Sequence, residues 1–322
     1  LCAALPGVAS EELFRAVRAA DAARVKAELG KGADVNAKDS SGATILTQAA
    51  LNSTVDVVKL LLDKGADPNR ANSAGATALM LGIDDLRKVR LLVERKAAVN
   101  AASAAGKTPL MLAAGRDGGS AVVKFLLSKG AEVDAKDKAG ATALILAAEA
   151  GDAATLQLLL DKGAEVNHRA NSEFNDVKFG IASEQRPMPR VEKGGPNALM
   201  TAVAGGNLAA AKLLVARGAD PKVKLLPGFT ALTFAAGRGG IEMVRLLVES
   251  GADVNAVDAE GHTPLILASA SEEAGVDVVK FLLGKGADVK VKGLEGRTAL
   301  GWAKTKGETA IVKALRDAGA PE

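Results

Sequence analysis

A spacing of roughly 33 residues, kept along almost the whole chain, is the feature that most limits how this sequence can fold, because such a period is typical of repeat arrays. A Gly-Ala pair marks the spacing, with Lys96 in the slot of one missing glycine. The glycines of these pairs are Gly32, Gly65, Gly130, Gly163, Gly218, Gly251, Gly286 and Gly319. A glycine two residues before a threonine keeps the same period, at Gly42, Gly75, Gly106, Gly140, Gly228, Gly261 and Gly296, with Gly195 and Asn197 in the remaining slot. The sequence therefore predicts one array of repeats rather than separate domains.

One interval of the array is longer than the others. Gly163 and Gly218 lie farther apart than other neighbouring landmarks by about 22 residues, and an excess of this kind within a regular array is typical of a loop insertion. The repeats on both sides keep their landmarks, which places the insertion within residues 171–194. We therefore expect residues 10–322 to form a single array and residues 1–9 to be a tail.

Composition excludes several classes of partner. Apolar residues make up 48% of the chain, which is enough for a core, but no run approaches the roughly 18 apolar residues of a membrane-spanning helix. The net charge is +3, with 41 basic and 38 acidic residues interleaved, and aromatic residues are 2%. A nucleic-acid groove needs clustered cations and stacking aromatics, so we do not expect nucleic-acid binding. Because no apolar run is long enough, we do not expect membrane insertion either. Cys2 is the one cysteine, so no disulfide framework is available.

Residues 1–9, LCAALPGVA, have the form of the end of a secretory signal peptide. The stretch is apolar and closes on the small-x-small pattern Gly7-Val8-Ala9. We therefore expect export to the periplasm or beyond the cell. The alternative is an ordinary apolar tail that covers the first repeat, in which case the protein stays in the cytoplasm.

Residues 137–170 are the clearest copy of the repeat and predict a turn followed by two short helices. Gly140 suits a turn that needs positive φ, and Thr142 is expected to cap the first helix. Apolar residues at positions i, i+3 and i+4 give each helix one buried face: Leu144, Ala147 and Ala148, then Leu156, Leu159 and Leu160. Gly151 and Gly163 are expected to end the two helices. Helices this short are marginal alone in water, so their stability must come from stacking on neighbouring repeats.

Three stretches, GKTPLMLAA from Gly106, GHTPLILAS from Gly261 and VVKLLLDKGADPN from Val57, resemble the ankyrin repeat. The resemblance covers nearly the whole chain. It implies a mainly α solenoid of about nine helix-turn-helix repeats, with β-hairpin finger loops and a concave groove between the fingers and the first helices. It also implies a non-catalytic protein–protein interaction scaffold without a cofactor.

The chain departs from the family pattern in two ways. Ankyrin repeats commonly carry His after the leucine of T-P-L-H, but here the slot holds Thr47, Met80, Met111, Ile145, Met200, Thr233, Ile266 and Gly301. We expect apolar packing to replace the histidine hydrogen bonds, a style that resembles bacterial members of the family. Lys96 stands where a left-handed glycine is expected, at a cost on the order of 1 kcal/mol. The third repeat is also two residues short, so we expect it to be the softest joint.

No motif in the chain predicts catalysis or metal binding. The stretch AAGKT, ending at Thr108, ends like a phosphate loop, but Ala101 replaces the first glycine, and the repeat explains Gly106 as a turn residue and Thr108 as a cap. His168 and His262 lie in or beside fingers without a partner cysteine, and His262 is expected to be exposed. The adjacent pairs Asp84-Asp85 and Glu272-Glu273 are expected to be solvated.

Candidate partner-binding residues fall in three places. The position two residues after the repeat leucine faces the groove, and it holds Gln48, Leu81, Leu112, Leu146, Thr201, Phe234, Leu267 and Trp302. Leucine there also packs between repeats, so Phe234 and Trp302 are the unusual members, and large aromatics are good anchors. The finger tip KLLPGFT presents Leu226 and Phe229 around a Pro-Gly turn. Arg238 and His262 complete the candidates near the groove.

The insertion supplies the third group of candidates, Phe174, Phe179, Ile181 and Met188. Apolar and polar residues alternate loosely there, and prolines around Met188 disfavour a helix, which predicts an extended arm. Two interpretations stay open: the arm and the Leu226 tip form a knob that docks a partner, or the arm covers its own repeat.

Function is expected to be recognition by a monomer with a protein partner of unknown identity. The alternative is an accessory or structural module of a larger exported enzyme or cytochrome system. The chain contains no C-x-x-C-H haem motif, so any haem in that alternative would lie elsewhere.

Overall fold

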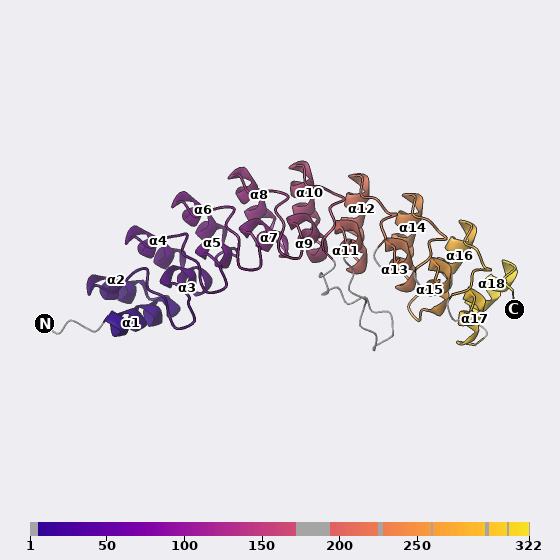
Figure 1. Ribbon diagram of the computed structural model, residues 1–322, viewed down its shortest axis with the longest axis horizontal. Helices are drawn as coiled ribbons and strands as arrows, with labels where there is room; N and C mark the ends of the chain where they lie inside the picture. The colour runs from indigo at the N-terminus through magenta and orange to yellow at the C-terminus, as the bar shows by residue number, and fades with distance from the viewer. Residues whose placement is uncertain are drawn as a thin grey trace. The chain divides into compact units, whose positions relative to one another are not determined.

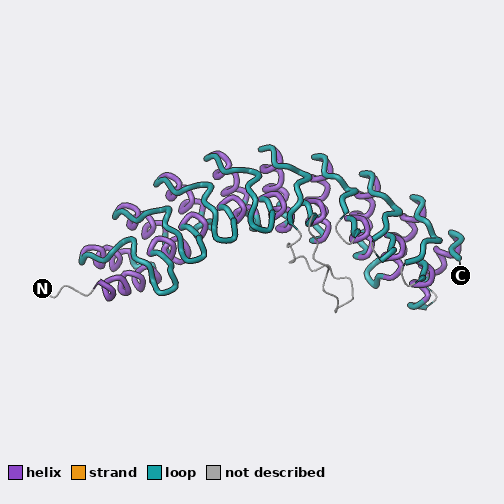
Figure 2. Tube along the Cα trace, in the orientation of Figure 1, coloured by secondary structure: helices purple, strands orange, loops and turns teal. Residues whose placement is uncertain are grey.

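The computed structural model describes residues 6–171, 194–224, 228–258, 260–293, 296–307 and 309–321. Within these ranges the regular structure is eighteen α-helices, with no strand. The loops carry two isolated antiparallel bridges, Lys38 with Thr44 and Lys224 with Thr230. Figure 2 shows the same alternation of helices and loops along the trace. The mainly helical expectation is confirmed.

Contacts divide the chain into two compact units. The first comprises residues 1–138 and 161–163, and the second comprises residues 139–160 and 164–322. The helices of the first unit are α1 (Pro6–Arg18), α2 (Ala22–Gly30), α3 (Ile45–Asn52), α4 (Val55–Asp63), α5 (Ala78–Leu81), α6 (Leu86–Glu94), α7 (Pro109–Ala114) and α8 (Ser120–Ser128). Within this unit, odd-numbered helices contact one another along one layer and even-numbered helices along a second layer (Figure 1).

The second unit repeats this two-layer arrangement. It contains α9 (Ala143–Ala150), α10 (Ala153–Asp161), α11 (Ala198–Ala204), α12 (Leu208–Ala216), α13 (Ala231–Gly237), α14 (Ile241–Glu249), α15 (Pro264–Ala270), α16 (Val276–Gly284), α17 (Ala299–Lys304) and α18 (Ala310–Asp317), of which Asp161 groups with the first unit. Each odd-numbered helix from α9 to α17 contacts the next odd-numbered one. Every helix after the first has four to nine residues, so packing rather than intrinsic propensity must hold them.

The first helix begins earlier than the sequence predicts. Helix α1 starts at Pro6, whereas the array was expected from Ser10. Residues 1–5 lie outside the described part of the chain. Export therefore stays a prediction.

Threonines begin most of the first-layer helices, as the repeat pattern predicts. A threonine side chain accepts a hydrogen bond from the backbone N–H three residues later at Thr44, Thr108, Thr230, Thr263 and Thr298. Thr142 stands at the same position, but its side chain makes no capping bond, so the expected cap there is wrong. Gly140, Gly151 and Gly163 have φ of 72°, 73° and 85°, which confirms their left-handed geometry.

The core consists of the apolar faces of the helices. Leu144, Leu156 and Leu159 are at most 1% exposed, as the helical spacing predicts. Leu160 is half-buried instead. A fully buried leucine contributes roughly 1.5–3 kcal/mol relative to an exposed one, so these positions supply much of the stacking energy.

The position that commonly carries histidine in related repeats is occupied mainly by buried apolar side chains. Its occupants Met80, Met111, Ile145 and Ile266 are at most 2% exposed, which confirms the expected apolar replacement. Thr47 is fully buried and forms a capping box, in which its hydroxyl accepts from the Thr44 backbone N–H.

Five asparagines each join one loop to the next loop along the chain. The Nδ2 group of Asn36 donates to the Gly65 carbonyl at 3.1 Å, and its Oδ1 accepts from the Asp67 backbone N–H at 2.9 Å. The asparagines that make this pair of bonds are Asn36, Asn69, Asn100, Asn167 and Asn255. These bonds fix the loop positions, because they satisfy backbone groups that would otherwise need water.

The third repeat has a distinct core. Helix α5 has only four residues. Lys88 is 8% exposed at the position where sister helices carry residues such as Val57 and Val122, and its Nζ donates to the Ala50 carbonyl at 2.9 Å. Burying an ammonium is costly unless it is hydrogen-bonded. This lysine and the short helix are consistent with a soft joint, which stays a prediction.

Candidate protein-binding surface

The predicted groove positions fall into two groups by burial. Gln48, Leu81, Leu112, Leu146 and Trp302 are half-buried. Thr201, Phe234 and Leu267 are 2%, 6% and 8% exposed. Phe234 therefore offers little free ring surface, and the expectation of an open aromatic anchor at this position is wrong.

Phe234 instead supports Arg238, one turn later in the same repeat. The Arg238 guanidinium carbon lies 5.6 Å from the centre of the Phe234 ring. The Nη1 group donates to the Ala204 carbonyl at 2.8 Å, which lies at the end of α11. The side chain as a whole is exposed. A cation held at two points keeps donors for a partner at a reduced entropic cost.

A hollow of about 430 Å³ adjoins Arg238 in the second unit. The turn between α11 and α12 and the turn between α13 and α14 line it, with mainly apolar groups from Val203, Leu208, Ile241 and Met243. Gly206, Gly239 and Gly240 also line the hollow. Gly239 allows the backbone of Glu273 to approach closely, since an added Cβ would lie 2.4 Å from the Glu273 carbonyl oxygen. The repeat pattern gives no signal for this hollow, which depends on how adjacent turns pack.

His262 is held inside its loop rather than exposed. Its side chain is 18% exposed, and Nδ1 lies 3.4 Å from Asp258 Oδ2 and 3.5 Å from Glu260 Oε2. The imidazole also approaches Gly293 of the next loop, where an added Cβ would lie 3.1 Å from Cδ2. The expectation of an exposed histidine is wrong, because the neighbouring loop covers it.

The remaining aromatic candidates are partly accessible. Trp302 is half-buried, and the Arg297 guanidinium carbon lies 4.9 Å from its ring centre. Phe229 is also half-buried. Leu226, and the arm residues Phe174, Phe179, Ile181 and Met188, lie outside the described residues.

The two ends of the insertion meet in a closed base. Ala170 donates its backbone N–H to the Pro196 carbonyl at 3.1 Å, and Gly195 donates to the Ala170 carbonyl at 2.9 Å. The Asn171 N–H donates to the Ala139 carbonyl at 2.7 Å, which ties the base to the preceding loop. The insertion therefore leaves from and returns to one point, as its placement in a loop predicts.

Arg169 fastens this base. Its guanidinium donates to the carbonyls of Gly194, Gly195 at 3.1 Å and Lys224 at 2.8 Å. Burial lowers the pKa of Arg169. Arg169 is not among the residues that the repeat pattern predicts for a partner-binding site. Its place directly before the break in the period is the signal that could have drawn attention to it.

The stretch that resembles a phosphate loop, residues 104–108, forms the turn and helix cap that the repeat predicts. Gly106 has φ of 80°, and the Thr108 hydroxyl accepts from the Met111 backbone N–H to begin α7. The Lys107 side chain is exposed. These three residues therefore serve a turn and a cap.

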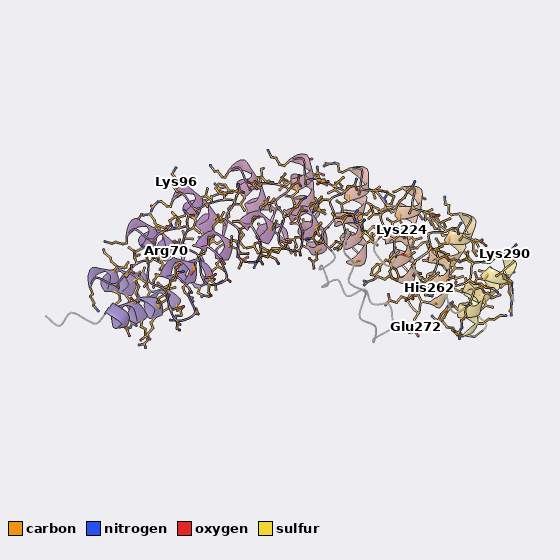
Figure 3. The ribbon with its side chains drawn as sticks, in the orientation of Figure 1. Arg70, Lys96, Lys224, His262, Glu272 and Lys290 are labelled. Carbon is orange, nitrogen blue, oxygen red and sulfur yellow. The ribbon has the colours of Figure 1, made fainter. Side chains whose placement is uncertain are left out.

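Lys96 has φ of 69°, the left-handed value predicted for its slot. Its side chain is exposed and points away from the ribbon (Figure 3), while its carbonyl accepts from Asn69. Lys96→Gly should raise the free energy of unfolding by about 0.5–1 kcal/mol, because glycine adopts this geometry without strain. Urea unfolding measures the change. Gly130→Ala is the reciprocal control, since its φ is 83° and an added Cβ meets nothing within 4 Å. If the two variants shift stability in the same direction, strain at Lys96 is excluded.

Asp63 links the second and third repeats. It accepts from Lys59 Nζ at 2.6 Å in its own helix and from Arg95 Nη2 at 2.6 Å after α6. Hydrogen bonds from Lys59 and Arg95 lower the pKa of Asp63. Asp84 pairs with Arg116, and Asp85 caps α6, so these adjacent carboxylates are partnered rather than only solvated.

The lowered pKa of Asp63 predicts a pH-dependent contribution. A carboxylate with a depressed folded pKa stabilises the protein above its unfolded pKa of about 3.9, and this contribution is lost as pH falls through the folded pKa. Asp63→Asn should therefore lower the Tm slightly at pH 7 and not at pH 2. Thermal melts at both pH values test this. Glu94→Gln, at an exposed carboxylate without an ion pair in the described structure, should leave the Tm unchanged at both. A Tm difference that persists at pH 2 would assign the effect to packing.

Comparison with protein families matches three stretches of the chain to the family described as "Ankyrin repeats (3 copies)". The matched residues are 13–103, 82–170 and 199–293, which together are well over half of the chain. The unmatched residues between 170 and 199 contain the insertion. A comparison with curated proteins finds no match. None of the helices in the described ranges has the length and apolar character needed to span a bilayer.

Proposed function

The chain belongs to the ankyrin repeat family, and from this premise we propose that it is a scaffold that binds a partner protein through the groove and loops of its second unit. Ankyrin repeats are generally protein–protein interaction modules without catalysis of their own. The proposal includes nine repeats, each made of one helix pair, with finger loops between them. Export of the chain is a further part of the proposal.

The arrangement around Arg238 is the observation that carries the proposal. An exposed cation is held by Phe234 and the Ala204 carbonyl beside an apolar hollow. Binding sites typically combine an apolar depression with a few oriented polar groups. We propose that a partner inserts an apolar side chain into the hollow and places an acceptor against Arg238. Trp302 and Phe229 would extend this contact within the same unit.

The insertion adds a second contact region in this proposal. Its base is fixed by Arg169 at the edge of the second unit's loops. Lengthening a loop adds little to the entropic cost of closing it. The sequence of the insertion can therefore serve partner recognition while the helices keep their packing. The arm residues Phe174, Phe179, Ile181 and Met188 and the tip residue Leu226 are proposed contacts.

Cross-linked pull-down from the source cells tests the proposal. The chain should be compared with an Arg238→Glu variant and with a chain in which residues 172–193 are replaced by Gly-Ser. We expect both to lose the same cross-linked partner. The loop replacement should retain the wild-type Tm, and Arg238→Glu should lower the free energy of unfolding by only about 1 kcal/mol, through loss of the bond to the Ala204 carbonyl. Lys212→Glu, an exposed residue on α12, is the charge control. Unchanged capture by both variants would contradict the proposal, and a large drop in Tm on loop replacement would favour the interpretation that the arm covers its own repeat.

A further inference from the structure

Two phenylalanines on second-layer helices each contact a pair of cations. In the first unit the Arg90 guanidinium lies 5.2 Å from the centre of the Phe125 ring and Lys129 Nζ lies 5.6 Å from it. In the second unit the Arg245 guanidinium lies 4.6 Å from the Phe281 ring and Lys285 Nζ lies 5.5 Å from it. We call these sets the first and second Arg–Phe–Lys clusters.

The two clusters use the same positions of the repeat. Both phenylalanines stand five residues before the glycine landmark, where other repeats carry Leu60, Leu91, Leu158, Leu213 and Leu246. Both arginines stand six residues before the landmark of the preceding repeat, where other repeats carry Lys59, Lys124, Gln157, Lys212 and Lys280. Arginine therefore occupies this position only in the repeat directly before a phenylalanine. This co-occurrence of arginine and phenylalanine in adjacent repeats distinguishes the two clusters from the other charged residues on the surface.

Neither arginine pairs with the carboxylate one turn later on its own helix. Arg90 has Glu94 four residues later on its helix, and Arg245 has Glu249, yet neither pair forms an ion pair within the described structure. By contrast, Lys59 pairs with Asp63 at the same helical spacing. Each guanidinium instead lies over the ring of the next repeat. Stacking on a ring orients a guanidinium and leaves its in-plane N–H donors available.

The cations around each ring are exposed. Lys124 and Lys280, which precede the two phenylalanines in the sequence, are exposed as well. No ion pair or hydrogen bond of these six side chains to another described residue is found. Each phenylalanine is half-buried. Two cations already lie over the part of the molecule where each ring is found. A ring occupied in this way is a poor platform for a nucleic-acid base or a wedge into a bilayer, whereas the guanidinium edge fits a carboxylate bidentately.

We propose that the two Arg–Phe–Lys clusters bind acidic segments of a partner protein, on the second-layer helices rather than the groove. Each cluster takes a segment with neighbouring Asp or Glu side chains, and one chain therefore binds two such segments. Asp277 lies three residues before Lys280 on α16, so the second cluster binds the more weakly. The site is independent of the groove and loops, and its failure would leave the proposed function intact.

Isothermal titration with a synthetic peptide of Glu pairs separated by Gly-Ser tests this inference on the full chain. We expect two sites per chain, weakened by added salt. Arg90→Gln and Arg245→Gln should each weaken one site about tenfold or more, and the double variant should weaken both. Lys212→Gln, at the same helical position before a leucine repeat, should bind as the wild type does.

A second pair of variants separates binding from repeat packing. Phe125→Leu and Phe281→Leu carry the leucine found in sister repeats, so they should fold, but they free the arginines and should weaken peptide binding severalfold. If the arginine variants lower the Tm and leave peptide affinity unchanged, the clusters are packing elements and the inference is overturned. Preferential binding to phosphatidylserine vesicles or to duplex DNA, lost in the double variant, would also overturn it.

Discussion

Leu247→Ala should lower the free energy of unfolding by about 3 kcal/mol, within the roughly 2–5 kcal/mol typical of such core truncations. Leu247 is fully buried in α14, a helix that contacts α12, α13 and α16. The substitution leaves a cavity at a position where several helices meet. Because the repeats rely on one another, the loss should appear in the main unfolding transition measured by urea and not as fraying of one helix.

Leu51→Ala is the matched control for this core truncation. Leu51 lies on α3 and is 54% exposed. Its loss should change the free energy of unfolding by no more than about 0.5 kcal/mol. If the two leucines cost the same, burial between helix pairs is not what stabilises the array.

Arg169→Met should lower the free energy of unfolding by about 2–3 kcal/mol, because three carbonyls at the base of the insertion lose a charged donor. The donor bonds run to Gly194, Gly195 and Lys224. Methionine keeps much of the apolar length of the side chain, so the change isolates the hydrogen bonds. Hydrogen exchange at the Gly195 amide should also become faster, since that amide closes the base.

Arg70→Met is the control for the loss of a loop arginine. Arg70 donates from Nη1 to a single carbonyl, that of Asn36, at 2.9 Å. Its replacement should cost about 1 kcal/mol. Equal losses at the two positions would show that Arg169 does not fasten the insertion.

The repeat period predicts most of the fold because the signals that place each helix along the chain are local, although packing between repeats stabilises it. The threonine caps, the left-handed glycines and the apolar helix faces all lie within one period. Thr77 and Thr142 are exceptions, residues at the right position without a capping bond. Only the geometry of the surrounding turn decides whether such a hydroxyl reaches the free amide.

The candidate site was less predictable, because it depends on contacts between repeats. Sequence position alone made Phe234 an open anchor and His262 an exposed loop residue, yet adjacent elements cover both. Arg238 and Arg169 gain their roles from carbonyls far along the chain. Such contacts follow from the register of one repeat on the next, which a pattern within a single repeat does not specify.

One helix pair of this array should not fold alone, because its two helices are too short without neighbouring repeats. A synthetic peptide of residues 137–170 contains both α9 and α10, which have eight and nine residues in the folded chain. Far-ultraviolet circular dichroism of this peptide in water should show a largely unfolded spectrum without a cooperative melt, whereas the full chain should be helical and melt cooperatively. A helical peptide spectrum with a sigmoidal thermal transition would contradict the account.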